Sequence, residues 1–402
     1  MSNGWEKALD ELVAIQAARQ VALRRHLHAN PEPSGEEYQT ARYVFGALQE
    51  AGLSPRLSPS QRGVVVDVGE GEPQLGLRAD MDALRVQDAK EATYRSRRVG
   101  VMHACGHDGH TAAVYGALLG LVEAKQRNLL PCSVSCRGLF QPAEETSEGA
   151  RELIESGAVT GLRALLSLHM DPSRSVGRIG LRYGALTAAC DSIEICVTGR
   201  GGHAARPHES IDPIAAAAQL ISSIYLFVPR AAQSFDPVVV TFGQVRAGDN
   251  PNVIPERAEL LGTLRTLGGA SRERAKLHIQ QLARGLAEVS GTRIDVTFGE
   301  GPESVVNDSG LNDLVKAAAV GVLGEESIDL IDRASMGGED FAYYLRHVRG
   351  AMFRLGCASP TAGSSPLHSN RFDLDEQALT IGAQILARAV VLWHQPDALR
   401  SI

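Results

Sequence analysis

The sequence predicts an α/β protein with a mixed, mostly parallel sheet flanked by helices, into which a smaller α+β domain is inserted. The first observation is the length of 402 residues, which suits two or three domains. The second is that short apolar runs alternate with helical patterns in the two outer parts of the chain. The third is that residues 188–300 follow a different order of elements.

The N-terminal part begins with two helical patterns, at 4–29 and 36–51. The second of these follows the turn-forming stretch PEPSG, so we expect Ser34 to cap it, with Glu37 three residues further on. Further strands are expected at 63–68, 75–78, 134–140 and 164–168, and further helices at 111–125, 148–156, 310–323 and 374–393. This alternation predicts a sheet with helices on both faces.

The middle part has the element order of a ferredoxin-like unit, β-α-β-β-α-β. Its expected strands lie at 192–198, 238–245, 259–267 and 292–298, and its expected helices at 212–227 and 271–290. We therefore expect a large domain formed by 1–187 and 301–402, with 188–300 inserted into it.

Composition and charge exclude several classes of protein. A net charge of −7 and a pI near 6.0 argue against a nucleic-acid-binding surface. No apolar run approaches the roughly 18 residues that a membrane span needs, and the polar, amphipathic start does not read as a signal peptide. The six cysteines include no CxxC pair, so we expect free thiols and a cytoplasmic location.

The stretch MHACGHDGH at 102–110 is the strongest sign of chemistry. It holds three histidines, one cysteine and one aspartate in a loop that two glycines loosen. A closed zinc site would need four cysteines and histidines in paired spacing, which the sequence lacks. The stretch therefore indicates an open, catalytic metal site whose other ligands lie elsewhere, and any of its three histidines qualifies.

Three predicted strands end in side chains that suit such a site. Asp80 and Asp82 follow the strand at 75–78, Glu144 and Glu145 follow the strand at 134–140, and His169 follows the strand at 164–168. Each alone is commonly a helix cap, a solvated acid or a core histidine. Because sites in open α/β sheets form beyond the carboxyl ends of the strands, we expect these residues to converge.

The mixed ligand set suits several divalent metals. Thiolate and imidazole favour zinc, cobalt or nickel, and carboxylates extend the range to manganese. With five or six ligands, two metals about 3.5–4 Å apart can be held. Neighbouring side chains in extended backbone point in opposite directions, so one of Glu144 and Glu145 can bind metal while the other moves protons. Asp82 can orient a ligand histidine.

Ten ordered motifs show a resemblance that covers nearly the whole chain. They are RRHLHANPE (24–32), RADMDAL (78–84), MHACGHDGHTA (102–112), FQPAEE (140–145), LHM (168–170), GRGGHAARPH (199–208), NPNVIP (250–255), GTLRT (262–266), MGGEDFAYYL (336–345) and LHSNRFD (367–373). In these motifs the sequence resembles the aminoacylase and carboxypeptidase superfamily of co-catalytic metallopeptidases. It is most similar to the amidohydrolase branch with hippurate hydrolase, N-acyl-amino-acid amidohydrolases and plant auxin-conjugate hydrolases.

The resemblance implies roles for individual residues of the large, phosphorylase/hydrolase-like catalytic domain. It implies two divalent metal ions per subunit (Zn, Mn, Co or Ni), with Glu144 as general acid/base and Asp82 orienting a ligand. The implied metal ligands are Cys105, His107, Glu145, His169 and His368. The motif residues alone do not indicate His368 as a ligand.

The resemblance also implies that the inserted domain is a lid and a dimerisation domain, in a homodimer or a tetramer. His203 would reach the active site of the partner subunit and stabilise the tetrahedral oxyanion. Asn252 and Arg265 would bind the substrate carboxylate, and Gly338 would line the pocket. A guanidinium on a strand suits this role because it can grip a carboxylate with two hydrogen bonds.

The implied reaction is hydrolysis of the amide bond of an N-acyl amino acid to a carboxylic acid and a free amino acid, by a metal-activated water with a glutamate base. Two enzymatic alternatives stay open: a dipeptidase or carboxypeptidase of the same superfamily, and a related C–N hydrolase such as an aromatic deaminase. A catalytically inactive binding or scaffold protein is a third, against which the complete set of Glu144 and predicted ligands argues.

Overall fold

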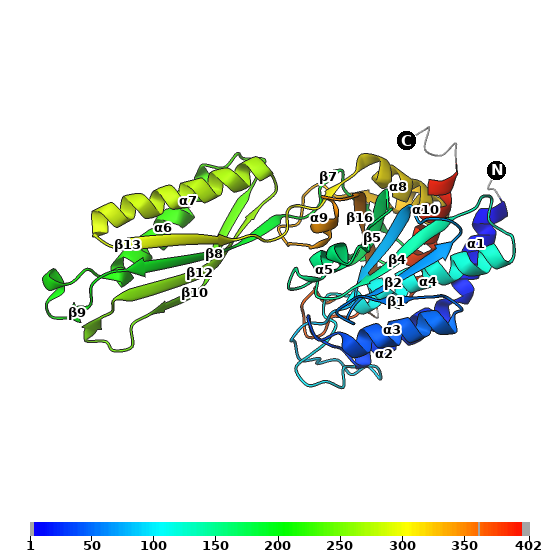
Figure 1. Ribbon diagram of the computed structural model, residues 1–402, viewed down its shortest axis with the longest axis horizontal. Coiled ribbons are helices and arrows are strands. Elements are labelled where there is room, and N and C mark those ends of the chain that lie inside the picture. Colours follow the sequence, from blue (N-terminus) through cyan, green and yellow to red (C-terminus); the bar gives the residue numbers. More distant parts are fainter. Residues whose placement is uncertain (1–3, 361, 396–402) are drawn as a thin grey trace. The chain divides into compact units, whose positions relative to one another are not determined.

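The computed structural model describes residues 4–360 and 362–395, which form two compact units (Figure 1). Unit 1 comprises the described residues of Met1–Gly184, Val306–Arg333 and Asp340–Ile402. Unit 2 comprises Ala185–Val305, which is green to yellow in Figure 1, and Ala334–Glu339. The short strands β7 (Gly184–Ala185) and β14 (Val306–Asn307) mark the points where the chain passes between them.

The boundaries of unit 2 differ from the expected limits of 188 and 300. The backbone N–H of Leu186 donates to Val305 O at 2.7 Å, so both residues belong to unit 2. The N–H of Ser335 donates to Leu186 O at 2.9 Å, and the N–H of Ala188 donates to Gly337 O at 3.0 Å. These bonds join residues 334–339 to unit 2, although they are distant from it in sequence.

Unit 1 is built on an eight-stranded sheet in the order β1-β2-β4-β3-β5-β16-β6-β15. Its strands are β1 (Arg56–Leu57), β2 (Val64–Gly69), β3 (Leu75–Asp80), β4 (Ser135–Gln141), β5 (Ala164–Ser175), β6 (Ile179–Leu181), β15 (Ile328–Leu330) and β16 (Arg349–Ala358). Strand β3 pairs in parallel with β4 and β5, and β5 pairs in parallel with β16. Antiparallel pairs lie towards the edges, at β1–β2, β2–β4 and β16–β6. The mixed, mostly parallel sheet is thus confirmed.

The helices of unit 1 are α1 (Gly4–Ile15), α2 (Ala17–Ala29), α3 (Tyr38–Glu50), α4 (His107–Gln126), α5 (Gly149–Glu155), α8 (Ser309–Leu323), α9 (Phe341–Tyr344) and α10 (Gln377–His394), with a 3₁₀ turn η2 (Glu325–Ser327). Helix α4 packs against α1, α2 and α10. Every residue of β3 and β4 is buried, as expected for central strands covered on both faces.

Unit 2 has the chain order that the sequence predicts. Its main elements are β8 (Ala189–Thr198), α6 (Pro213–Arg230), β10 (Val238–Ala247), β12 (Arg257–Thr266), α7 (Gly269–Ser290) and β13 (Arg293–Gly299). The strands form an antiparallel sheet in the order β10-β12-β8-β13. Both helices pack on one face, where Ile195 is buried with Leu220 and Ile279. Small elements β9 (Gly202–His203), β11 (Val253–Ile254) and η1 (Pro207–Glu209) complete the unit.

Two local predictions are wrong. The helical pattern at 4–29 is two helices, α1 and α2, separated at Gln16. Ser34 does not cap α3, which begins at Tyr38 after Glu37. The hydroxyl of Ser34 instead donates a 2.6 Å hydrogen bond to Asp82 Oδ2, because this buried carboxylate competes for it.

Strand β16 has no counterpart among the expected elements. Arg349 and Arg354 flank the short apolar stretch 351–353, so the local pattern is too short to predict a strand. Pairing with β5 on one side and β6 on the other forms this strand within the sheet. Tertiary pairing therefore decides a central element that local propensity does not.

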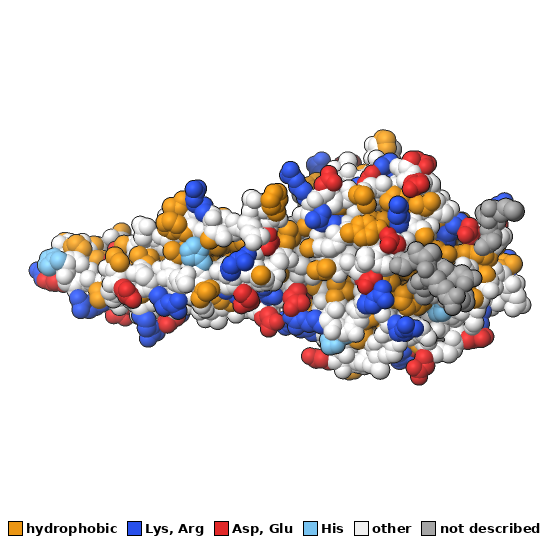
Figure 2. Space-filling model, turned by 90° about the horizontal axis from the view of Figure 1, so that it is seen from above, with side chains coloured by type: hydrophobic (Ala, Val, Ile, Leu, Met, Phe, Trp, Pro, Cys, Tyr) orange, Lys and Arg blue, Asp and Glu red, His pale blue; other side chains and the backbone are white. Residues whose placement is uncertain are grey.

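The described helices, surface and cysteines add three observations. None of the helices that the structure describes combines the length and the apolar content that a membrane span requires. On the face that Figure 2 shows, Lys and Arg side chains are interspersed with Asp and Glu side chains on both units. All six cysteines are unpaired thiols.

Candidate metal centre

The loop before α4 places Cys105 and His107 in the interior of unit 1. Gly106 between them has φ +91°, a left-handed conformation that favours glycine. A Cβ there would also lie 3.0 Å from Met170 Cβ. After the tight turn at Gly106, His107 is the first residue of α4, and Cys105 lies just before the turn. Both side chains are buried.

The predicted metal ligands come together in unit 1. We call Cys105, His107, Glu145, His169 and His368 the ligand cluster. Cys105 Sγ lies 3.6 Å from His169 Nε2. Glu145 Oε1 lies 3.9 Å from His107 Nε2 and 3.5 Å from His368 Nε2. Ligand atoms from Cys105, His107 and His169 form one close group, and those from Cys105, Glu145 and His368 form another, so Cys105 belongs to both.

Hydrogen bonds fix which ring nitrogen faces the cluster. His107 Nδ1 lies 2.9 Å from Asp82 O, and His169 Nδ1 lies 2.8 Å from Met170 O. A carbonyl oxygen only accepts, so both Nδ1 atoms carry a proton, and in the neutral ring the lone pair lies on Nε2, which faces the cluster. This is the usual arrangement of metal-binding histidines.

Two buried side-chain atoms of the ligand cluster have no hydrogen-bond partner within residues 4–360 and 362–395. They are His107 Nε2 and Glu145 Oε1. Burying a polar atom without a partner is costly, and such atoms call for an explanation. A divalent cation bound between an imidazole nitrogen and a carboxylate oxygen satisfies both. The cluster therefore fits divalent metal ions, as expected from its donor types.

Asp82 connects two members of the cluster. Its Oδ1 accepts from His107 Nδ1 at 3.0 Å, and its Oδ2 accepts from the backbone N–H of Glu145 at 3.0 Å. Burial alone would raise the pKa of Asp82, but His107 and the hydrogen bonds from His107, Ser34 and Glu145 hold that pKa below its usual value. Asp82 is thus a carboxylate in hydrogen-bond contact with His107, and its role in orienting a ligand stays a prediction.

Glu144 lies beside the cluster from the turn after β4. Its Oε2 is 3.9 Å from His107 Nε2, and its Oε1 accepts from the backbone N–H of Asp340 at 3.4 Å. Ala143, just before it, has φ +49°, which is uncommon for a residue with a side chain. The buried Glu37 carboxylate accepts from Ala143 N–H at 2.8 Å and so holds this turn.

The cluster has an unusual acid–base state before metal binds. Burial raises the pKa of the Cys105 thiol to about 12, so the thiol is protonated in the metal-free protein. The interaction with the nearby Glu145 carboxylate raises the pKa of His368. Metal binding at this centre must therefore release protons.

The other two histidines of the 102–110 stretch have different surroundings. His110 Nε2 accepts from Met170 N–H at 2.8 Å, and its Nδ1 lies 2.6 Å from Asp80 Oδ1, so both nitrogens are used. His103 has no hydrogen-bond partner among the described residues, and burial lowers its pKa to about 4. Hydrogen bonding separates His107 from His110, which the sequence pattern could not do.

His368 reaches the cluster from a loop near the end of the chain. Its backbone has φ +62°, and its N–H donates to Ala104 O at 2.7 Å. The side chain is 55% exposed, unlike those of the other members of the ligand cluster. No periodic pattern marks such a loop residue, so only the motif LHSNRFD identified it.

Sequence reasoning also missed a buried polar group beneath the centre. Arg78 Nη1 donates to Asp80 Oδ2 at 2.7 Å, and Arg78 Nη2 donates to Asp340 Oδ1 at 2.8 Å. Gln141 Nε2 donates to Asp340 Oδ2 at 2.8 Å. This group joins the ends of β3 and β4 to Asp340, whose N–H contacts Glu144. The sign of this group in the sequence was Arg78, a charged residue within the apolar strand pattern at 75–78.

The predicted substrate residues lie in unit 2, in two places. His203 pairs with Val253 in the β9–β11 ladder, and Ala204 N–H donates to Asn252 O, so His203 and Asn252 are neighbours. Arg265 lies opposite Cys190 in the sheet, and a Cβ on Gly338 would lie 3.2 Å from Cys190 Cβ. Arg265 and Gly338 thus share a neighbour. Their roles stay predictions.

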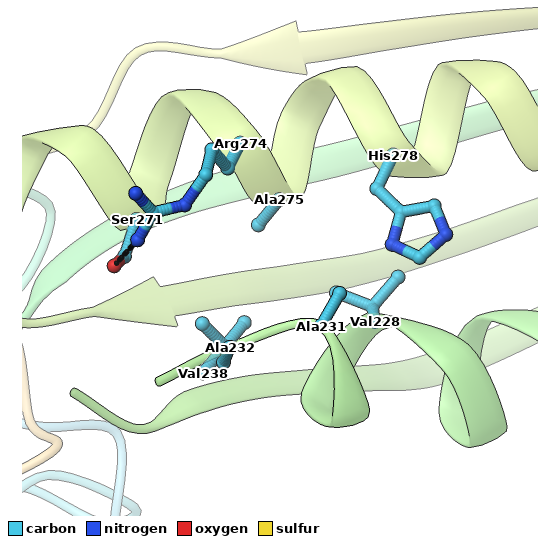
Figure 3. A pocket seen from close by; sticks show the side chains of 8 residues that line it. All are labelled: Val228, Ala231, Ala232, Val238, Ser271, Arg274, Ala275 and His278. Carbon is cyan, nitrogen blue, oxygen red and sulfur yellow. Dashed lines mark hydrogen bonds between the residues drawn. The ribbon is translucent and has the colours of Figure 1, made fainter. Parts of the chain in front are cut away.

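A hollow in unit 2 offers no alternative metal site. Figure 3 shows it between α6 and α7, with Arg274 and His278 on α7. Its lining is Val228, Ala231, Ala232, Val238, Ser271, Arg274, Ala275 and His278. This lining includes neither a carboxylate nor a cysteine, in contrast to the ligand cluster of unit 1.

A buried thiol–imidazole–carboxylate cluster beyond strands of an α/β sheet, with a further glutamate beside it, defines the class of metal-dependent hydrolases. Residues 76–391 match the model of Peptidase family M20/M25/M40, and the chain belongs to this family. The predicted superfamily and the prediction of a metal-dependent enzyme that hydrolyses amides are confirmed.

Relatives span almost the whole chain. A probable hydrolase of Synechocystis sp. is 40% identical over 395 residues, covering 97% of this chain and 100% of its own. The N-acetyl-L-cysteine deacetylase of Bacillus subtilis is 37% identical, covering 89% and 84%. The solved structure of the Bacillus subtilis YXEP protein, a dinuclear metal-binding peptidase of the M20 family, has a TM-score of 0.80 at 32% identity, covering 94% and 99%.

Proposed function

We propose that the protein hydrolyses the amide bond of N-acyl amino acids, releasing a carboxylic acid and a free amino acid, with two divalent metal ions in each chain. The observation that carries the proposal is the pair of buried, unpartnered ligand atoms, His107 Nε2 and Glu145 Oε1, with Glu144 beside them. A relative that deacetylates N-acetyl-L-cysteine supports an acylated amino acid as substrate.

The five residues of the ligand cluster would hold the metals. Cys105 belongs to both close groups of ligand atoms, which suits a ligand shared between two ions. When bound, zinc, manganese, cobalt or nickel would polarise the amide carbonyl and lower the pKa of water. The mixture of thiol, imidazole and carboxylate accommodates all four metals.

Glu144 would act as the general base and then the general acid. Asp340 N–H holds one oxygen of its carboxylate, and the other oxygen lies 3.9 Å from His107 Nε2, at the edge of the cluster. Glu144 would take a proton from the attacking water and give it to the leaving amine. Asp82 would keep His107 in the tautomer whose Nε2 faces the metals.

Unit 2 would supply substrate recognition and the subunit contact. Arg265 and Asn252 would bind the substrate carboxylate, Gly338 would line the pocket, and His203 would stabilise the oxyanion in the active site of the partner subunit. Exposed apolar side chains on α6, among them Tyr225 and Leu226, support a homodimer formed through this unit, with a tetramer as the alternative. We further propose a cytoplasmic location.

A substrate panel tests the proposal. Protein reconstituted with Mn, Zn, Co or Ni is assayed with N-acetyl and N-benzoyl amino acids and with unblocked dipeptides. We expect the acylated amino acids to be cleaved faster, with equal amounts of carboxylic acid and amino acid formed. Faster cleavage of dipeptides would assign a peptidase, and ammonia without a carboxylate product would assign a deaminase. No hydrolysis with any metal would favour a binding protein.

A further inference from the structure

A second buried group of charged residues surrounds the start of α4. We call Arg24, His28, Asp88, Lys90, Asp108, Asp373 and Glu376 the Arg24 network. It joins α2, residues 88–94, the first turn of α4 and the segment that leads to α10. None of its members belongs to the ligand cluster.

Arg24 is the centre of this network and is completely buried. Its Nε donates to Asp108 Oδ2 at 2.9 Å, its Nη2 donates to Asp373 Oδ1, and its Nη1 lies 3.3 Å from Glu376 Oε1. Its guanidinium also stacks 4.6 Å from the ring centroid of Tyr94. A planar group that is paired in several directions without water has little freedom to move.

The partners of Arg24 lie close in sequence to metal ligands. Asp108 directly follows His107 in the first turn of α4. Asp373 lies in the motif LHSNRFD, which also contains His368. Arg24 therefore links the segments that carry two ligands from distant parts of the chain, while it touches neither ligand itself.

Other residues around Arg24, including the neighbouring Tyr94, hold the same two segments. His28 Nδ1 lies 2.8 Å from Asp108 Oδ2, and Tyr94 OH donates to Asp373 Oδ2 at 2.8 Å. Lys90 Nζ lies 2.8 Å and Asp88 Oδ2 lies 3.4 Å from His28 Nε2, so both ring nitrogens of His28 have contacts within the network. The network thus restrains the start of α4 and the His368 segment together.

We propose that Arg24 is a positioning residue of the metal centre, which sets the distance between His368 and the ligands at the start of α4. His368 depends on such support because it is half-exposed and its backbone is left-handed. The inference rests on the proposed function, since it assumes that the ligand cluster binds metal. A purely structural Arg24 would stabilise unit 1 without changing the affinity for metal.

The test compares the affinity for Co²⁺ in four proteins: the parent, Arg24→Met, Asp373→Asn and the control Arg388→Met. Arg388 is a matched control because it is buried and pairs with Asp10 at 2.6 Å, joining α10 to α1. Affinity is measured by competition with a chelator, and thermal unfolding is followed without metal. The absorption band between cobalt and the Cys105 thiolate reports on the ligands directly.

We expect Arg24→Met and Asp373→Asn to bind Co²⁺ about 10–100-fold more weakly, the usual effect of losing support behind a ligand. Arg388→Met should lower the unfolding temperature and leave the affinity within about twofold of the parent. Equal affinity in folded Arg24→Met and parent, or an equal loss in Arg388→Met, would overturn the proposal. If Arg24→Met does not fold, Asp373→Asn decides by the same criterion. A parent that binds no Co²⁺ would refute the proposed function itself.

Discussion

The ligand cluster and the Arg24 network lie side by side in unit 1 and contain the same kinds of side chain. Both gather histidines and carboxylates around the first turn of α4, and both are largely buried. In the Arg24 network the chain supplies its own cations, with Arg24 on Asp108 and Lys90 on Asp88. In the ligand cluster, His107 Nε2 has no partner among the described residues.

The acid–base states of neighbouring residues show the consequence. Burial alone would raise the pKa of Asp108, but Arg24 and His28 hold that pKa far below its usual value. Three residues away, burial raises the pKa of the Cys105 thiol to about 12. One group is neutralised by cations of the chain itself, whereas the other keeps ligand atoms that a divalent cation can bind. A buried polar cluster thus indicates a metal site only when the hydrogen bonds within it leave ligand atoms unused.

The largest effect is expected for Glu144→Gln, which tests whether the carboxylate beside the cluster moves protons. We expect kcat to fall by roughly 10³-fold, because the amide cannot accept the proton of water. The metal content, measured by elemental analysis, should equal that of the parent, since Glu144 is not one of the assigned ligands. Turnover near that of the parent would refute the assigned role.

Cys105→Ala tests the ligand that belongs to both groups of ligand atoms. Loss of a direct ligand should exceed the roughly 100-fold upper limit that is usual for residues behind a ligand. Chelator competition, as used for the Arg24 variants, allows the loss of metal affinity in Cys105→Ala to be compared directly with the loss in those variants. Unchanged metal stoichiometry in Cys105→Ala would show that Cys105 is not a metal ligand. The contrast between the ligand cluster and the Arg24 network would then be lost.

Metal removal tests whether the cluster requires a cation for full stability. A metal that binds only the folded chain at 100 times its Kd should add about 2.7 kcal/mol to the free energy of unfolding. Urea unfolding with and without Zn²⁺ or Co²⁺ measures this difference. The shift should be much smaller in Cys105→Ala, and an equal shift in both proteins would indicate binding elsewhere.

His110→Gln tests the distinction between two histidines of the same stretch. Because His110 is hydrogen-bonded at both nitrogens, its loss should cost roughly 1–3 kcal/mol of stability and leave the metal content unchanged. His107→Gln is the matched variant and should lose metal. Equal loss of metal from His110→Gln and His107→Gln would contradict the distinction between the two histidines.

A pH-dependent effect of similar size concerns Glu37, which holds the turn before Glu144. Burial and the nearby Asp82 raise its pKa from 4.5 to about 7, so the folded chain keeps a proton there that the unfolded chain releases. This carboxyl therefore lowers stability as the pH rises from about 4.5 through 7. In metal-free protein, Glu37→Gln should gain about 2.5 kcal/mol relative to the parent at pH 8 compared with pH 5. Parallel pH profiles in urea unfolding would contradict this.

Several features of the site could be predicted from the sequence, because local chemistry determines them. The expected strands are followed by Asp82, by Glu144 and Glu145, and by His169. We predicted that these side chains converge, and in the structure they lie close together. Strand β5 continues past His169, so the ligand lies within the strand and not after it. The element order of unit 2 also followed from periodicity alone.

The sequence by itself thus determined the fold class, the family motifs and the residue types of the metal centre, since each is written in short runs of the chain. The resemblance named His107 as the ligand of the 102–110 stretch, but only the tertiary structure shows the contacts that distinguish it from His110. His107 and His110 differ because the first donates to Asp82 and the second accepts from Met170, and both partners are distant in sequence. Likewise, β16 and the Arg24 contacts arise from pairing between distant segments, which no local pattern records.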